Sequence, residues 1–98
     1  MVKLENINQK LEKWDDAQPD MPTMKDSIIL MLATGPGIGG DKTFDYMDLG
    51  LKLKKSTDDI IEIEKAELKI LSDAVRAPSS KLNAWAQGQI KGYLDRVA

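Results

Sequence analysis

The sequence predicts a mainly α fold, a compact bundle of four to five helices that forms one domain over residues 1–98. Apolar residues recur every three or four positions along most of the chain, and prolines and glycines separate these stretches. Only a short segment near 60–63 alternates as an extended strand would. With 98 residues, of which 42% are apolar, the chain can bury one modest core.

Residues 1–18 are predicted to form an N-terminal helix or an N-terminal arm. Large apolar side chains follow helical spacing among charged ones: Leu4, Ile7, Leu11 and Trp14. In an extended arm the same side chains would anchor to a core or to a neighbouring subunit. Residues 19–22 are a linker because they contain Pro19 and Pro22. The helical core then occupies residues 23–98.

A helix is predicted over residues 24–34. Thr23 and Asp26 make a capping pattern, in which the hydroxyl accepts from an early backbone amide and the carboxylate lies near the positive end of the helix. Gly35 fits the left-handed position that ends a helix, and Pro36 cannot continue the hydrogen-bond ladder.

The glycine-rich loop at 35–43 resembles two phosphate-binding fingerprints. Asp41 separates the last glycine from Lys42, which breaks the spacing of a phosphate loop and places a carboxylate where phosphate would lie. We therefore favour a helix-to-helix connection. The alternative is a small-ligand or cyclic-nucleotide site made by the following residues: Gly37, Gly39, Gly40, Lys42 and Thr43.

The helix predicted over 42–55 has apolar stripes on two opposite faces. One stripe comprises Phe44, Met47 and Leu51, and the other comprises Tyr46, Leu49 and Leu53. Either neighbouring helices cover both stripes, or one stripe contacts another protein. We predict that the second stripe binds the partner, since tyrosine is enriched in interfaces, with Asp45 and Asp48 as rim charges.

Two further helices complete the predicted bundle. Residues 64–77 carry an apolar stripe and end at Pro78. Ser79 or Ser80 is predicted to cap the last helix, whose apolar side runs from Leu82 to Val97. The four-residue spacing of two glycines in that helix predicts close packing against another backbone: Gly88 and Gly92.

The composition argues against most enzyme chemistry. The chain has no cysteine and no histidine, so it lacks a thiolate nucleophile and the commonest general base and metal ligand. The acidic pairs Asp15-Asp16 and Asp58-Asp59 suit turns better than a metal site. We expect no catalytic residue, no metal and no cofactor. A net charge of −2 disfavours duplex nucleic acid, and the short apolar runs predict a soluble cytoplasmic protein without a membrane span.

The order of these elements, with the segments Ile-Glu-Ile-Glu-Lys-Ala-Glu-Leu at 61–68 and Trp-Ala-Gln-Gly-Gln-Ile at 85–90, resembles the small accessory proteins of tailed bacteriophages. The resemblance spans roughly residues 24–97 and transfers no site residue. It implies a phage-encoded, non-enzymatic protein that modulates or inhibits a host protein, including one of a defence system. A virion or tail assembly factor is the alternative that the same resemblance implies. We also expect the chain to form a homo-oligomer.

Overall fold

The computed structural model describes residues 1–17, 19–34, 43–76 and 84–97, and it confirms the mainly α fold. In these ranges the chain forms four helices and two short strands. In chain order they are β1 (Val2–Leu4), α1 (Met24–Thr34), α2 (Thr43–Lys55), β2 (Ile61–Ile63), α3 (Lys65–Arg76) and α4 (Ala84–Val97).

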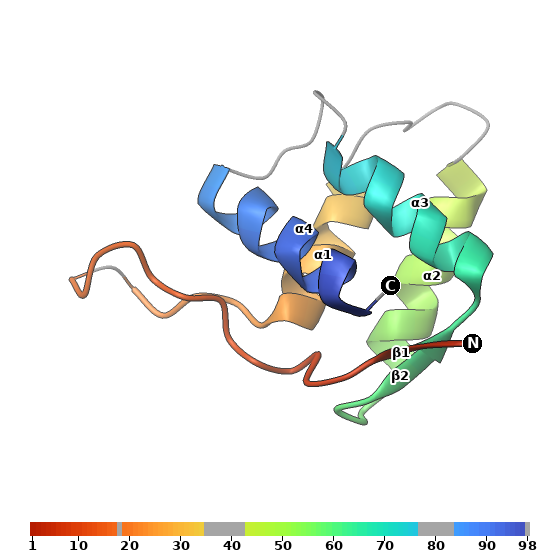
Figure 1. Ribbon diagram of the computed structural model, residues 1–98, viewed down its shortest axis with the longest axis horizontal. Coiled ribbons are helices and arrows are strands. Elements are labelled where there is room, and N and C mark those ends of the chain that lie inside the picture. Colours follow the sequence, from red (N-terminus) through yellow and green to blue (C-terminus); the bar gives the residue numbers. More distant parts are fainter. Residues whose placement is uncertain (18, 35–42, 77–83, 98) are drawn as a thin grey trace.

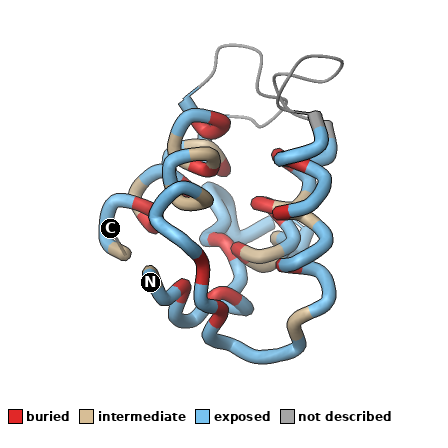
Figure 2. The backbone as a smooth tube through the Cα atoms, turned by 90° about the vertical axis from the view of Figure 1, so that its right-hand side faces the viewer, coloured by how far each residue is buried: buried red, intermediate tan, exposed pale blue. Residues whose placement is uncertain are grey.

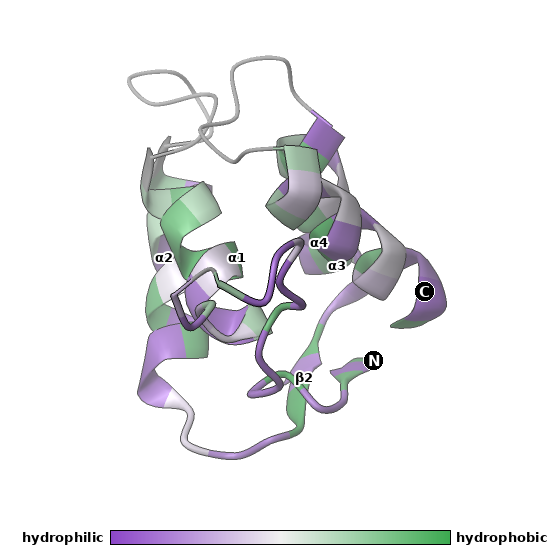
Figure 3. Ribbon diagram, turned by 90° about the vertical axis from the view of Figure 1, so that its left-hand side faces the viewer, coloured by the Kyte–Doolittle hydropathy of each residue, from purple (hydrophilic) through white to green (hydrophobic). Residues whose placement is uncertain are grey.

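The helices form two packed pairs, α1 with α2 and α3 with α4, and α1 also contacts both helices of the second pair (Figure 1). Seen from the side, the two pairs stand next to each other, and the two-stranded sheet lies at one end of them (Figure 3). The buried positions of each helix turn inward between the pairs (Figure 2). The core therefore draws on every helix and both strands.

Side chains of neighbouring residues cap two helices. The Thr23 hydroxyl accepts a hydrogen bond from the Asp26 amide at 3.1 Å, as the capping pattern predicts. At the start of α3 the Glu67 carboxylate reaches back to the Glu64 amide at 2.9 Å. The predicted serine cap of the last helix lies outside the described residues, and the structure begins α4 at Ala84.

The N-terminal segment is an arm, so the amphipathic helix that its spacing suggested is not formed. Val2, Lys3 and Leu4 pair antiparallel with Ile63, Glu62 and Ile61, in that order. The chain then turns at residues 5–8, where Asn6 takes a left-handed φ of 54° that asparagine tolerates. The arm pairs its backbone with distant segments through the amides of Ile7 and Leu11, which donate to Asp59 and Pro22.

The arm is extended because its large side chains are needed at separate points of the core. Leu4, Ile7 and Leu11 are all buried, although they lie on different elements of the arm. A helix would place them on one narrow stripe and would leave the β2 edge without its partner strand. On the outer side of the sheet, Lys3 lies opposite Glu62, which is a favourable cross-strand pair of charges.

The two glycines of α4 do not pack against another backbone, which corrects that prediction. A Cβ atom built at Gly88 or at Gly92 meets nothing within 4 Å. Both glycines line a pocket between α4 and residues 9–12 of the arm, and no backbone packs closely against them.

Candidate functional site

The α2 stripe that was predicted to bind a partner lies in the core. Tyr46, Leu49 and Leu53 are 7%, 2% and 0% exposed and belong to the single core cluster of buried residues. Leu49 and Leu53 cannot contact a second protein unless the helix detaches, so the prediction that these two residues are partner anchors is wrong, and they hold α2 against the rest of the fold. Tyr46 also packs in the core, but one side of it lines a groove at the surface between α2 and α1.

The opposite stripe of α2 faces outward. Phe44, Met47 and Leu51 are 72%, 52% and 43% exposed, and we call these three residues the α2 outer stripe. If the second stripe bound a partner, this first stripe would be the one in the core, and its exposed fractions show that it is not buried. Three large apolar side chains at helical spacing on one exposed face are characteristic of a protein interface.

A shallow apolar groove of about 340 Å³ runs between α1 and α2, beside the outer stripe. We call it the α1–α2 groove, and its walls are formed by Ile29, Leu32, Ala33, Tyr46, Met47, Gly50, Leu51 and Lys54. Gly50 leaves the groove open because it has no side chain. A Cβ atom at this position would lie 3.9 Å from the Leu32 Cβ atom, an ordinary contact.

One of the two predicted rim charges borders the outer stripe. Asp48 lies one turn from Phe44, and Lys55 lies one turn from Leu51, so both charges are on the same flank of the stripe. Neither makes an ion pair with any residue in the described ranges. Asp45 lies further round the helix from the outer stripe than Asp48 does, beside Lys52, which is ion-paired with Glu67 of α3.

An ion pair joins α2 to α3 on the flank away from the groove. The Lys52 ammonium lies 2.8 Å from the Glu67 carboxylate, which also caps α3. Partial burial acts to raise the pKa of Glu67, but the hydrogen bond from the Glu64 amide and the charge of Lys52 outweigh it, so the pKa of Glu67 is lowered. Lys52 is therefore occupied within the chain, whereas Lys55 is available to a partner.

A second exposed apolar cluster lies where the arm crosses α4. The rings of Trp14 and Trp85 meet edge to face with centroids 6.5 Å apart, and their residues are 55% and 41% exposed. The Trp85 indole donates to the Glu12 carbonyl oxygen at 2.5 Å. The Gln89 amide both accepts from the Glu12 amide and donates to its carbonyl oxygen, so α4 holds this part of the arm as a paired strand would.

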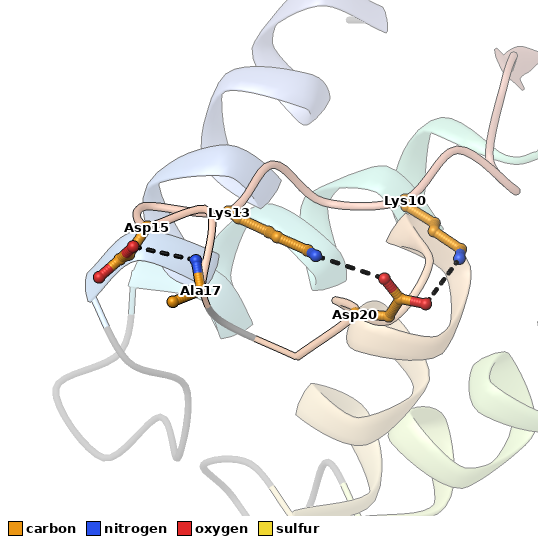
Figure 4. A network of polar contacts seen from close by, with 5 residues as sticks. All are labelled: Lys10, Lys13, Asp15, Ala17 and Asp20. Atoms are coloured by element: carbon orange, nitrogen blue, oxygen red, sulfur yellow. Dashed lines mark hydrogen bonds and ion pairs between the residues drawn. The ribbon is translucent and has the colours of Figure 1, made fainter.

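Charged side chains close the loop between the arm and α1. Asp20 lies 3.4 Å from the Lys13 ammonium and 3.6 Å from that of Lys10 (Figure 4). The hydrogen bond from Lys13, together with the charges of both lysines, lowers the pKa of Asp20. The Asp15 carboxylate accepts from the Ala17 amide at 3.0 Å, which is a turn contact. These contacts shape the arm.

The second acidic pair also serves backbone geometry. The Asp59 carboxylate accepts from the Asn8 amide at 3.0 Å and so ties the arm to the segment before β2. Within the described ranges no group of three or more acidic side chains gathers to hold a metal ion. The glycine-loop residues Gly37, Gly39, Gly40 and Lys42 lie outside the described residues, and so does the side chain of Thr43.

Comparison with known proteins adds no family to these observations. No protein family matches the chain, and no curated protein or solved structure is significantly similar to it. In the parts of the chain that the structure describes, every helix is too short or too polar to cross a bilayer.

The sequence predicted α2 correctly, but it assigned a partner to the stripe that the fold buries, and it did not predict the groove. The two stripes have nearly the same composition, three large apolar residues each, so spacing alone could not separate inside from outside. Gly50 was the available signal, since a glycine inside a helix lowers helix stability and commonly marks close approach or open space beside another element.

Proposed function

We propose that this chain is a non-enzymatic interaction protein that binds a partner protein through the α1–α2 groove and the α2 outer stripe. The observation that supports this most directly is the continuity of apolar surface across two helices. It runs from Ile29 and Ala33 on α1 to Met47 and Leu51 on α2 and on to Phe44. Exposed apolar surface that extends over neighbouring elements is typical of interaction sites.

An amphipathic helix is the partner element that best suits this surface. Two neighbouring helices with an apolar groove between them can receive a third helix, whose anchors recur at every third or fourth residue. The missing side chain at Gly50 gives one such anchor room to enter the groove. Lys54 at the groove wall and Asp48 beside the stripe would orient the incoming helix by charge.

The resemblance to small accessory proteins of tailed bacteriophages supports a host protein as the partner. By covering a surface on that protein, including a component of a defence system, the chain would modulate or inhibit it in the host cytoplasm. A virion or tail assembly factor would use the same groove on a phage protein. The chemistry that the groove requires, an exposed apolar helix face on the partner, is the same for both.

Affinity capture with matched groove variants tests the proposal. The baits are the wild type and two variants, Gly50→Leu and Gly88→Leu, which add the same side chain to a helix inside and outside the α1–α2 groove respectively. We expect a host or phage protein to be retained by the wild type and by Gly88→Leu and lost by Gly50→Leu. Calorimetry with the purified partner then measures the loss.

Circular dichroism and thermal unfolding check that each bait is folded, and replacing a helical glycine should stabilise either variant by up to about 1 kcal/mol. Equal retention of the partner by Gly50→Leu and the wild type would remove the groove from the interaction. If the folded wild type captures no protein, the proposed function is contradicted.

A further inference from the structure

We infer that, in the free protein, the α1–α2 groove is covered by a second copy of this chain, with the two α2 helices packed antiparallel about a twofold axis. The inference rests on the proposed function in so far as both assign the α1–α2 groove as an interface. It goes further because it names the occupant and the orientation.

The charges beside the outer stripe select a second copy. Asp48 is near the start of the exposed face and Lys55 is at its end, on the same flank of the helix. When two helices pack antiparallel through one stripe, side chains on the same flank of each helix meet across the interface. Asp48 of each copy therefore approaches Lys55 of the other, which gives two equivalent ion pairs by symmetry.

The parallel arrangement lacks this complementarity. With both helices pointing the same way, the acidic starts of the two α2 helices would lie together, as would the lysine-rich ends formed by Lys54 and Lys55. Like charges placed opposite each other disfavour that arrangement. The helix dipoles add to the same preference, because antiparallel packing brings opposite helix ends together.

The apolar residues fit the same twofold arrangement. The twofold axis that pairs Asp48 with Lys55 passes between Leu51 and Lys52, so the Leu51 side chains of the two copies lie opposite each other beside the axis. Gly50 lies on the flank of the stripe that faces α1, with its Cβ position 3.9 Å from the Leu32 Cβ atom, so the missing side chain leaves room in the α1–α2 groove for side chains of the second copy. The outer stripe can thus pack against the same stripe of a second copy, with opposite charges facing each other beside it.

The size of the surface sets the expected strength of association. A helix of 13 residues is about 20 Å long, so a face made of α2 and its neighbour α1 falls below the roughly 1,200 Å² of a standard stable interface. We therefore expect a dimer that dissociates in the micromolar range. A host protein that binds this face would displace the second copy, because both occupy the same groove.

Sedimentation equilibrium of charge-reversed variants tests the inference. The wild type should change from the chain mass of 10.9 kDa to twice that mass between micromolar and millimolar concentration. Asp48→Lys and Lys55→Asp should each weaken self-association about tenfold, because both ion pairs become like-charge contacts. An equimolar mixture of the two variants should recover the wild-type association, since their charges are complementary only in the mixed dimer.

Asp45→Lys is the matched control, because it makes the same change of charge further round α2 from the outer stripe, beside the Lys52 that pairs with α3. It should associate as the wild type does. The inference is overturned if the wild type stays at the chain mass at millimolar concentration, if the mixture associates no better than its components, or if Asp45→Lys weakens association as much as Asp48→Lys. The capture experiment with Gly50→Leu reports separately on the proposed function. If the wild type is a monomer that captures a partner and Gly50→Leu does not capture it, the inference of a dimer fails but the proposed function stands.

Discussion

The two helix pairs differ in what they leave exposed. The α3–α4 pair is bordered by charged side chains, with Arg76 of α3 lying 3.6 Å from Asp95 of α4, and its large exposed apolar residue, Trp85, is in contact with the arm. The α1–α2 pair instead leaves four large apolar side chains at least 43% exposed, namely Leu30, Phe44, Met47 and Leu51. The exposed surface of the α3–α4 pair is mostly charged, as on a typical monomer, whereas the α1–α2 pair exposes an apolar face.

This difference shows how the chain divides its apolar residues between folding and binding. On α3 the buried residues Leu71, Ala74 and Val75 lie on one side, and most of the rest of the helix is polar. On α2 two apolar stripes compete, and the core has room for one. The surplus stripe is what we assign to a partner, so the comparison predicts that truncating side chains on the two faces of α2 will have different consequences.

The largest contrast is expected between Leu53→Ala and Leu51→Ala. Leu53 is 0% exposed, so its truncation removes buried contacts and leaves a cavity, which costs about 2–5 kcal/mol of unfolding free energy. Leu51→Ala should cost under about 1 kcal/mol because the side chain already contacts water. Urea unfolding measures both. Equal losses for the two variants would mean that the outer stripe is part of the core, and the comparison would fail.

A second test removes a hydrogen bond between α4 and the N-terminal arm. The Tyr93 hydroxyl on α4 donates to the Glu5 carbonyl oxygen at 2.6 Å. Tyr93→Phe should lower the unfolding free energy by about 1–2 kcal/mol near neutral pH, because a partly buried acceptor loses its donor. Hydrogen exchange should show the arm amides of Ile7 and Leu11 opening first. Unchanged protection of these amides would show that the arm is held by its apolar side chains alone.

The difference in stability between the wild type and Tyr93→Phe should depend on pH. Burial raises the pKa of Tyr93 to about 12, with the nearby Asp59 charge contributing in the same direction. Since an unfolded tyrosine titrates near 10, this contribution to stability is complete below about pH 10 and is lost as the pH rises through about 12. The wild type should therefore lose stability more steeply than Tyr93→Phe over that interval. Parallel losses in the two proteins would contradict the raised pKa.

The sequence was sufficient for the helices because their signals are local. Thr23 and Asp26 fix the start of α1, and the lysines at the end of α2 fit its negative terminus, so α1, α2 and α3 begin and end within a residue of the predicted positions. The arm could not be assigned in this way. Leu4, Ile7 and Leu11 fit a helical stripe as well as an extended segment, and pairing with Ile61–Ile63, nearly sixty residues away, decides between the two.

The candidate site was harder to predict for the same physical reason. Which stripe of α2 is buried depends on where α1 and the core lie, and the residue types of the two stripes do not differ enough to show it. Tyr46 was chosen as an interface anchor from its amino-acid type, although a tyrosine can also be a large core residue with a polar tip. The exposed fractions of Phe44 and Met47 were available only from the assembled fold.

A smaller effect on stability is expected from substitution of the two glycines of α4. Gly88→Ala and Gly92→Ala should each stabilise the protein by up to about 1 kcal/mol, since alanine favours the helix and a Cβ atom meets nothing within 4 Å. Differential scanning calorimetry should register an increase of the melting temperature of several degrees. A decrease on either substitution would indicate that a second copy or another partner approaches α4 there, and would extend the uncovered surface beyond α1 and α2.

The smallest effect should come from the ion pair that links the two helix pairs. Both side chains of Lys52 and Glu67 are partly exposed, so Lys52→Ala should cost less than about 1 kcal/mol near neutral pH. Because the pKa of Glu67 is lowered in the fold, its contribution is present above the unfolded pKa and disappears as the pH falls through the folded value. The wild type and Lys52→Ala should therefore converge in acid, which urea unfolding at two pH values can measure. A loss of several kcal/mol on this substitution would mean that charge, rather than the apolar core between the pairs, holds α2 in place. The outer stripe would then have to be interpreted as the exposed side of a loosely attached helix.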